Sequence, residues 1–182
     1  MIGRRGGRPR LAPGLHFPSY RHDPGNTPHP YRHVEGHSHG RAEPTVGLLD
    51  PAAPFDSEPY LFGFDLFNHG YFWESHIWWE ALWRAHRQTG DVANLCRGLI
   101  RFAAASVKIR SGVPRGARKH CRATADLLDR VAGSAGSPVF AGIDLEGLAA
   151  HARSVADATP DKGLHPDLID TRFDWWLAPV HP

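Results

Sequence analysis

Apolar residues recur at helical spacing from Tyr60 to about residue 158, whereas the residues before Tyr60 show no sustained period. Gly70 is the expected end of a first helix, because glycine tolerates the left-handed conformation that closes many helices. Asp91 and Asp144 are expected N-caps, and Pro114 is a residue type favoured at the first helical position. The pattern therefore predicts five helices, over residues 60–69, 71–87, 91–112, 114–133 and 145–156.

The segment 71–87 is predicted to be the central helix, because it carries four of the six tryptophans. At a rotation of about 100° per residue its apolar side chains spread around most of the circumference. One stripe about 80° wide combines apolar and polar residues at this spacing. Its members are Phe72, His76, Glu80, Trp83 and Arg87.

The fold class predicted is all-α, a single helical bundle of about five helices. Residues 1–54 form an irregular segment rich in His and Pro, and we expect its first 16 residues, with Arg but no acid, to be mobile. The part from 17 to 40 combines aromatics, turn residues and His, and is a candidate to lie ordered across another surface. The bundle domain takes residues 55–158, and an aromatic tail, 159–182, is expected to dock on it through Phe173, Trp175 and Trp176.

Composition narrows the classes of function. The chain has 182 residues, 41% hydrophobic and 22% charged, which fits one domain, and a net charge of +2 gives no overall match to nucleic acid. Cys96 and Cys121 are too few for a disulfide framework and are expected to be reduced core residues. No stretch has the length and apolarity of a membrane span or of an export signal. We expect a soluble, cytoplasmic protein.

The segments 66–85 and 94–128 together resemble the family called domain of unknown function 309. The matching positions are Phe67, Asn68, Gly70, Phe72, Glu74, His76, Glu80, Trp83, Gly98, Leu99, Ile100, Gly116 and Ala117. Ile77 departs from the family pattern, which has a second acid beside the His. The resemblance covers residues 60–131 and implies an all-helical bundle, with no established activity.

His76 and Glu80 are one turn apart, the spacing at which a helix presents two ligands, or an acid and a base, to one point. A metal site needs a further ligand, for which His69, His120 and the N-terminal histidines are candidates. Glu74 lies about 160° from His76 around the helix and is expected to face another neighbour. Three interpretations stay open: a structural polar network, a metal or acid/base site, and a ligand pocket. The residues concerned are Glu74, His76, Glu80, Trp83 and Arg87.

Four histidines near the N-terminus follow the spacing H-x3-H-x3-H-x-H, a pattern that binds zinc or nickel. They are His29, His33, His37 and His39. Pro28 and Pro30 break any helix that would align them, so such a site would have to form in irregular backbone. A variant of this hypothesis has the segment fold over the bundle and add one His to His76 and Glu80.

Basic residues give little support to nucleic-acid binding. Arg97, Arg101 and Lys108 form a cationic stripe on the third predicted helix, and such a stripe is most often a solvated face. We therefore expect an uncharacterised helical-bundle protein with a polar His/Glu pocket that binds a small ligand, a metal or a protein partner. The alternative is a metal-assisted hydrolase that uses His76 and Glu80. The sequence leaves open whether it is an enzyme, its oligomeric state and its pathway.

Overall fold

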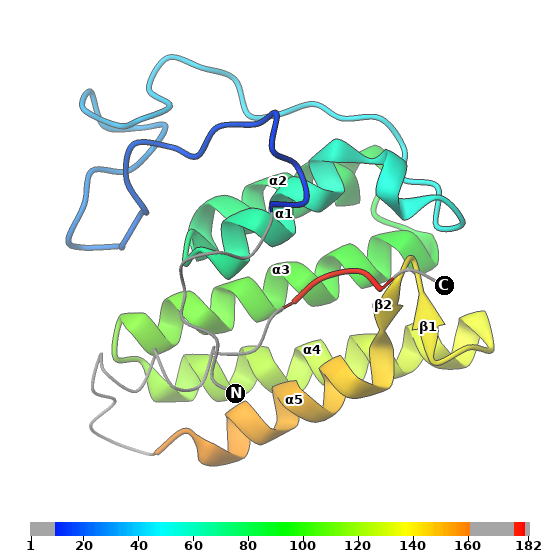
Figure 1. Ribbon diagram of the computed structural model, residues 1–182. Helices are drawn as coiled ribbons and strands as arrows, with labels where there is room; N and C mark the ends of the chain where they lie inside the picture. The colour runs from blue at the N-terminus through cyan, green and yellow to red at the C-terminus, as the bar shows by residue number, and fades with distance from the viewer. Residues whose placement is uncertain (1–9, 161–176, 181–182) are drawn as a thin grey trace.

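The computed structural model describes residues 10–160 and 177–180. Within them, five α-helices pack in chain order, each against the next (Figure 1). They are α1 (Glu58–Asn68), α2 (Phe72–Ala85), α3 (Gly90–Arg110), α4 (Pro114–Ala135) and α5 (Leu145–Ala158). A short 3₁₀ helix, η1 (Pro54–Asp56), precedes α1, and a hairpin of β1 (Val139–Phe140) and β2 (Ile143–Asp144) precedes α5. The predicted fold class is confirmed.

Local chemistry explains where these helices end. Gly70 has φ +82° and closes the first helix, as predicted. The Asp144 carboxylate accepts a hydrogen bond from the Gly147 amide at 2.9 Å and caps α5. Asp91 is not the N-cap of α3, because the helix begins at Gly90 and the Asp91 carboxylate accepts from the Ser134 hydroxyl.

The β-hairpin was not predicted. Val139 pairs with Asp144, and Phe140 pairs with Ile143, across a two-residue turn in which Ala141 and Gly142 both have positive φ. Two positive φ values are what a tight hairpin turn requires, but Ala is an unusual residue for the first of them. The sequence signal was therefore weak. The described end of the tail meets this turn, where the Val180 amide donates to the Gly142 carbonyl at 2.7 Å.

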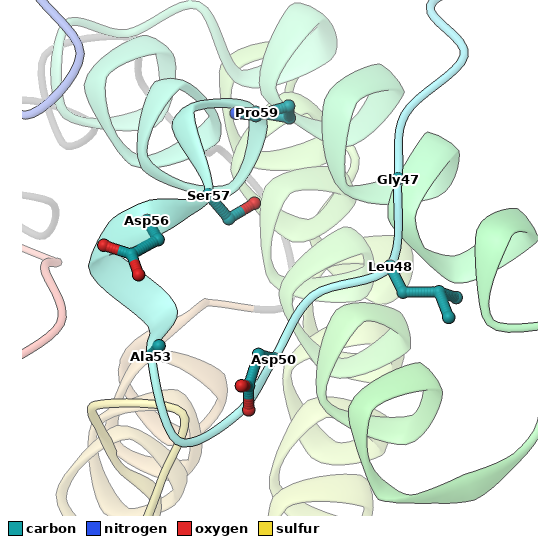
Figure 2. A pocket seen from close by; sticks show the side chains of 7 residues that line it. All are labelled: Gly47, Leu48, Asp50, Ala53, Asp56, Ser57 and Pro59. Carbon is teal, nitrogen blue, oxygen red and sulfur yellow. The ribbon is translucent and has the colours of Figure 1, made fainter.

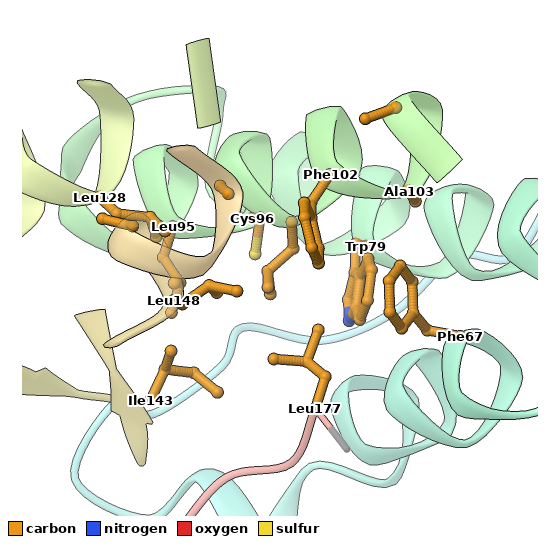
Figure 3. Packing of buried hydrophobic residues seen from close by; sticks show 14 of the residues in the cluster. Phe67, Trp79, Leu95, Cys96, Phe102, Ala103, Leu128, Ile143, Leu148 and Leu177 are labelled. Carbon is orange, nitrogen blue, oxygen red and sulfur yellow. The ribbon is translucent and has the colours of Figure 1, made fainter. Parts of the chain in front are cut away.

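The core is built around Trp79 of α2, which is fully buried (Figure 3). The Phe67 ring of α1 lies 6.0 Å from the Trp79 ring and stacks on Phe102 of α3 at 5.4 Å. Cys96 and Cys121 are free and buried as expected, and burial raises the pKa of each thiol to about 12. No helix in the described part of the chain is long and apolar enough to cross a membrane.

The tail enters the core at Leu177, which is 2% exposed. The Asn68 side chain fixes its backbone through two hydrogen bonds, donating to the Leu177 carbonyl at 2.7 Å and accepting from its amide at 3.0 Å. Phe173, Trp175 and Trp176, on which the predicted docking depended, lie outside the described residues.

Residues 10–16 contact α1 through the buried carboxylate of Asp65. The Leu11 and Ala12 amides donate to its two oxygens at 2.8 and 2.9 Å, and the Arg10 guanidinium lies 3.3 Å away. Ala12 is itself buried against α1. These contacts give residues 10–16 a defined place, whereas the mobility expected of residues 1–16 stays a prediction.

Gly63 sets the distance between α1 and α2, because a Cβ at this position would lie 2.3 Å from the Trp79 Nε1 atom. We expect Gly63→Ala to lower the free energy of unfolding by about 1–3 kcal/mol through overpacking. Urea unfolding measures this. Gly133→Ala is the matched control, because nothing lies within 4 Å of its Cβ position. There the better helix propensity of Ala should stabilise α4 by up to about 1 kcal/mol. Equal effects of the two substitutions would contradict the packing described.

Candidate functional site

Residues 20–49, which we call the covering segment, lie against α2 without forming a helix or strand (Figure 1). The contacts between the covering segment and α2 extend along this helix. His22 and His37 meet Glu74 near its beginning, and the Leu49 amide donates to His86 Nε2 just beyond its end, at 2.9 Å. The expectation that part of this region lies ordered on another surface is met by these contacts. α2 is thus packed on α1 and α3 and also covered by the N-terminal part of the chain.

Glu74 is the most deeply buried acid in the contact between α2 and the covering segment, at 4% exposure. Its Oε1 atom accepts from the His22 amide at 2.6 Å and lies 3.3 Å from His37 Nε2. Its Oε2 atom is buried and has no hydrogen-bond partner among the described residues. Burial raises the pKa of Glu74, and the hydrogen bond from the His22 amide partly opposes this rise.

Trp73 gathers three imidazoles around one indole. The rings of His22, His29 and His76 lie edge-on to it, with centroids 5.0, 5.3 and 5.3 Å away. Burial is the main cause that lowers the pKa of His22 and of His76, so both favour the neutral form. The His22 and Trp73 rings therefore form a weakly polar surface at the turn of α2 that carries Glu74.

His76 and Glu80 do come together, as predicted from their spacing, with His76 Nε2 3.8 Å from Glu80 Oε2. The other Glu80 oxygen lies 3.3 Å from Arg84, which in turn lies 3.0 Å from Glu43 of the covering segment. These side chains are partly exposed, so each pair contributes about 0–1 kcal/mol. The ion pair between Glu43 and Arg84 ties the covering segment to α2 at a further point.

Two members of the predicted stripe lie apart from this site. Arg87 is exposed and has φ +53°, because α2 ends at Ala85 instead of continuing through residue 87. Trp83 is half-buried and packs on the main core. The predicted stripe on α2 therefore ends at Trp83 and does not include Arg87.

The candidate metal ligands are scattered over the molecule. His69 hydrogen-bonds the Asp65 carbonyl at 2.7 Å, and His120 lies on α4. Of the four N-terminal histidines, His29 and His37 contact α2 side chains, whereas His33 and His39 are exposed. Across residues 10–160 and 177–180, no group of three or more His, Cys, Asp or Glu side chains is placed to hold a metal ion. Metal binding stays a prediction.

A pocket of about 300 Å³ lies elsewhere, between the end of the covering segment and η1 (Figure 2). Its lining residues are Gly47, Leu48, Asp50, Ala53, Asp56, Ser57 and Pro59. The Asp50 carboxylate accepts from the Ala52 amide at 2.9 Å, and both aspartates are exposed. None of the candidate site residues predicted from the sequence lines this pocket.

Sequence reasoning did not single out His22, Trp73 or His86 for a role. His22 belongs to the stretch expected to lie ordered on another surface, and the turn residues Asp23, Pro24 and Gly25 that follow it were the available signal. Which imidazole reaches which carboxylate depends on irregular backbone, and a loop has no period from which to predict this.

One comparison with known proteins gives a match. Residues 60–120 match the family model DUF309, a domain of unknown function. The resemblance stated from the sequence is thereby confirmed over α1, α2, α3 and the beginning of α4. Glu74, His76 and Glu80 lie inside the DUF309 match, whereas the covering segment that contacts them lies outside it. No curated protein and no solved structure matches the chain.

The contact between His86 and Leu49 predicts a pH dependence of stability. Burial lowers the pKa of His86 below its ordinary 6.5, and Nε2 accepts the Leu49 amide only when it is unprotonated. The stabilisation is therefore present above pH 6.5 and lost as the pH falls through the lowered pKa. We expect His86→Gln, which keeps an acceptor but does not titrate, to lose less stability than the wild type between pH 7.5 and 5.5 in urea unfolding.

The control for this experiment is His16→Gln, at an exposed position. It should follow the wild-type pH dependence. If His86→Gln also follows it, then the imidazole does not anchor the covering segment.

Proposed function

We propose that this protein is a binding module whose site is the Glu74 carboxylate under the covering segment. The ligand is a small organic cation, such as a primary amine, which donates a hydrogen bond to Oε2. The observation that carries the proposal is the burial of this oxygen atom without a partner. A donor bearing positive charge is the natural complement of a buried carboxylate oxygen.

The cost of burying Glu74 supports a role in binding over a purely structural one. A buried polar atom without a partner is destabilising by about 1–3 kcal/mol, and more if it is charged. A network that served only packing would gain from satisfying both oxygens or from replacing the acid with an apolar residue. Here one oxygen is held by His22 and His37 and the other is left for a further donor.

The surroundings of Glu74 suit an organic cation. The Trp73 indole, on the same turn of α2, offers a π face of the kind that attracts ammonium groups. Burial and the nearby His29 lower the pKa of His22, so this imidazole adds little competing positive charge near neutral pH. The site therefore combines one buried carboxyl group with weakly polar rings.

Entry to the site requires the covering segment to open, because Oε2 is buried beneath it. Residues 32–35 and 39–43 of this segment are exposed, and no helix or strand holds them. Local opening of such loops costs far less than global unfolding. Binding is therefore coupled to movement of the covering segment away from Trp73 and Glu74.

Calorimetric titration of the full chain with putrescine tests the proposal, and 1,4-butanediol serves as the neutral analogue. We expect saturable binding of the diamine only. Glu74→Gln should weaken this binding at least about tenfold, because a hydrogen bond to a charged group contributes about 1.5–3 kcal/mol. Asp126→Asn, at an exposed acid on α4, is the control and should leave affinity unchanged. Binding that survives Glu74→Gln would contradict the proposal, and so would no binding of the diamine.

Stability distinguishes this proposal from the structural network. Because burial raises the pKa of Glu74, the folded state holds the proton more tightly than the unfolded chain does. Ionisation of Glu74 therefore costs stability as the pH rises through the raised pKa. At pH 8 we expect Glu74→Gln to be at least as stable as the wild type in urea unfolding. A loss of about 1 kcal/mol or more would assign Glu74 to packing instead.

The hydrolase hypothesis has less support. His76 and Glu80 are close, but Glu80 is engaged by Arg84, and no third ligand is supplied by the residues described. A protein partner and a zinc ion remain further hypotheses for the same site, and a cytoplasmic location fits the two free cysteines.

A further inference from the structure

His120 faces α3 across the contact between α3 and α4. Two contacts show how α3 and α4 are aligned with each other. The Thr124 hydroxyl donates to the Gly98 carbonyl at 3.3 Å, and the Gly116 Cβ position lies 3.2 Å from the Lys108 side chain. His120 is four residues from both Gly116 and Thr124, so it lies on the same face of α4 as they do. It is therefore opposite the part of α3 between Gly98 and Lys108.

That part of α3 carries basic residues, of which the solvent-exposed Lys108 lies against Gly116 of α4. Arg101 and Lys108 are seven residues apart, which places them on one face of α3, two turns apart. Lys119 adds a third cation from α4, next to His120 in sequence. Burial first, and then these three charges, lower the pKa of His120. No carboxylate is among the groups that shift the pKa of His120.

The imidazole itself has an unused hydrogen-bonding atom. His120 Nδ1 is buried and has no hydrogen-bond partner within the described residues. A buried polar atom of this kind usually has a partner in a folded protein. Because Lys108 lies against α4 one turn before His120, and Lys119 precedes His120 in sequence, an anion is the natural partner for this atom.

We propose that the α3 and α4 helices form a phosphate-binding site, in which Arg101, Lys108 and Lys119 surround the anion and His120 Nδ1 donates to it. A doubly charged phosphate group fits three cations better than a single carboxylate does, and the Arg guanidinium matches its oxygens with two parallel hydrogen bonds. The phosphate group belongs to a free ion or to a small phosphorylated molecule. This site is separate from Glu74, so the two proposals stand or fall independently.

Titration of the ¹⁵N-labelled full chain with inorganic phosphate and with glycerol phosphate tests the site, at constant ionic strength. We expect a saturable chemical-shift change at the His120 imidazole and no comparable change at the exposed His16. Arg101→Gln and Lys119→Gln should each weaken binding about tenfold, which corresponds to about 1.4 kcal/mol. Tighter binding of glycerol phosphate than of phosphate would identify a phosphorylated small molecule, and the reverse would identify the free ion.

Arg130→Gln is the matched control. Arg130 is exposed near the other end of α4, where its Nε donates to the Asp126 carbonyl at 3.1 Å. An equal loss of affinity in Arg130→Gln would overturn the proposal, because binding would then follow net charge. A linear, non-saturating shift of His120 would also overturn it. If a single-stranded oligonucleotide binds equally to the wild type and to His120→Gln, and phosphate does not bind, then the basic face contacts phosphodiesters instead.

Discussion

The buried carboxylate of Glu74 is the interaction on which the arrangement of the N-terminal half depends. A carboxylate removed from water must be given hydrogen-bond donors or be protonated. α2 has no side chain that donates to Glu74, and the donors come from His22 and His37, more than 35 residues away in the sequence. The covering segment therefore lies where it does because α2 carries an acid on a face that the other helices leave unpaired.

The helices could be predicted because their signal is periodic. Burying one face of each helix repeats apolar residues every three or four positions, and this spacing located all five. Glu74 was correctly expected to face a different neighbour from His76, since both sit on a regular helix. The hairpin at Ala141, the early end of α2 before Arg87, and the pairing of His37 with Glu74 were not predictable in this way. Each depends on irregular backbone, where tertiary contacts choose the conformation.

The match to DUF309 separates two kinds of residue. Inside it, Asn68 holds the Leu177 backbone, Gly98 packs against Leu128, and Gly116 accommodates Lys108. These positions maintain the bundle. The partners of Glu74 come from outside the matched range, so the environment of this carboxylate is a property of the longer chain. α2 thus packs against α1 and α3 of the matched range and also contacts a segment that lies outside it.

The central claim is that the covering segment seals the Glu74 carboxylate, and the backbone amide of His22 reports this most directly. Hydrogen exchange at this amide, followed by NMR at neutral pH, measures how often the contact opens. The account predicts exchange at least about a hundredfold slower than the intrinsic rate of an unprotected amide, and faster than that of the core amides of α3. Exchange at the intrinsic rate would show that His22 does not donate to Glu74, and the account would then be wrong.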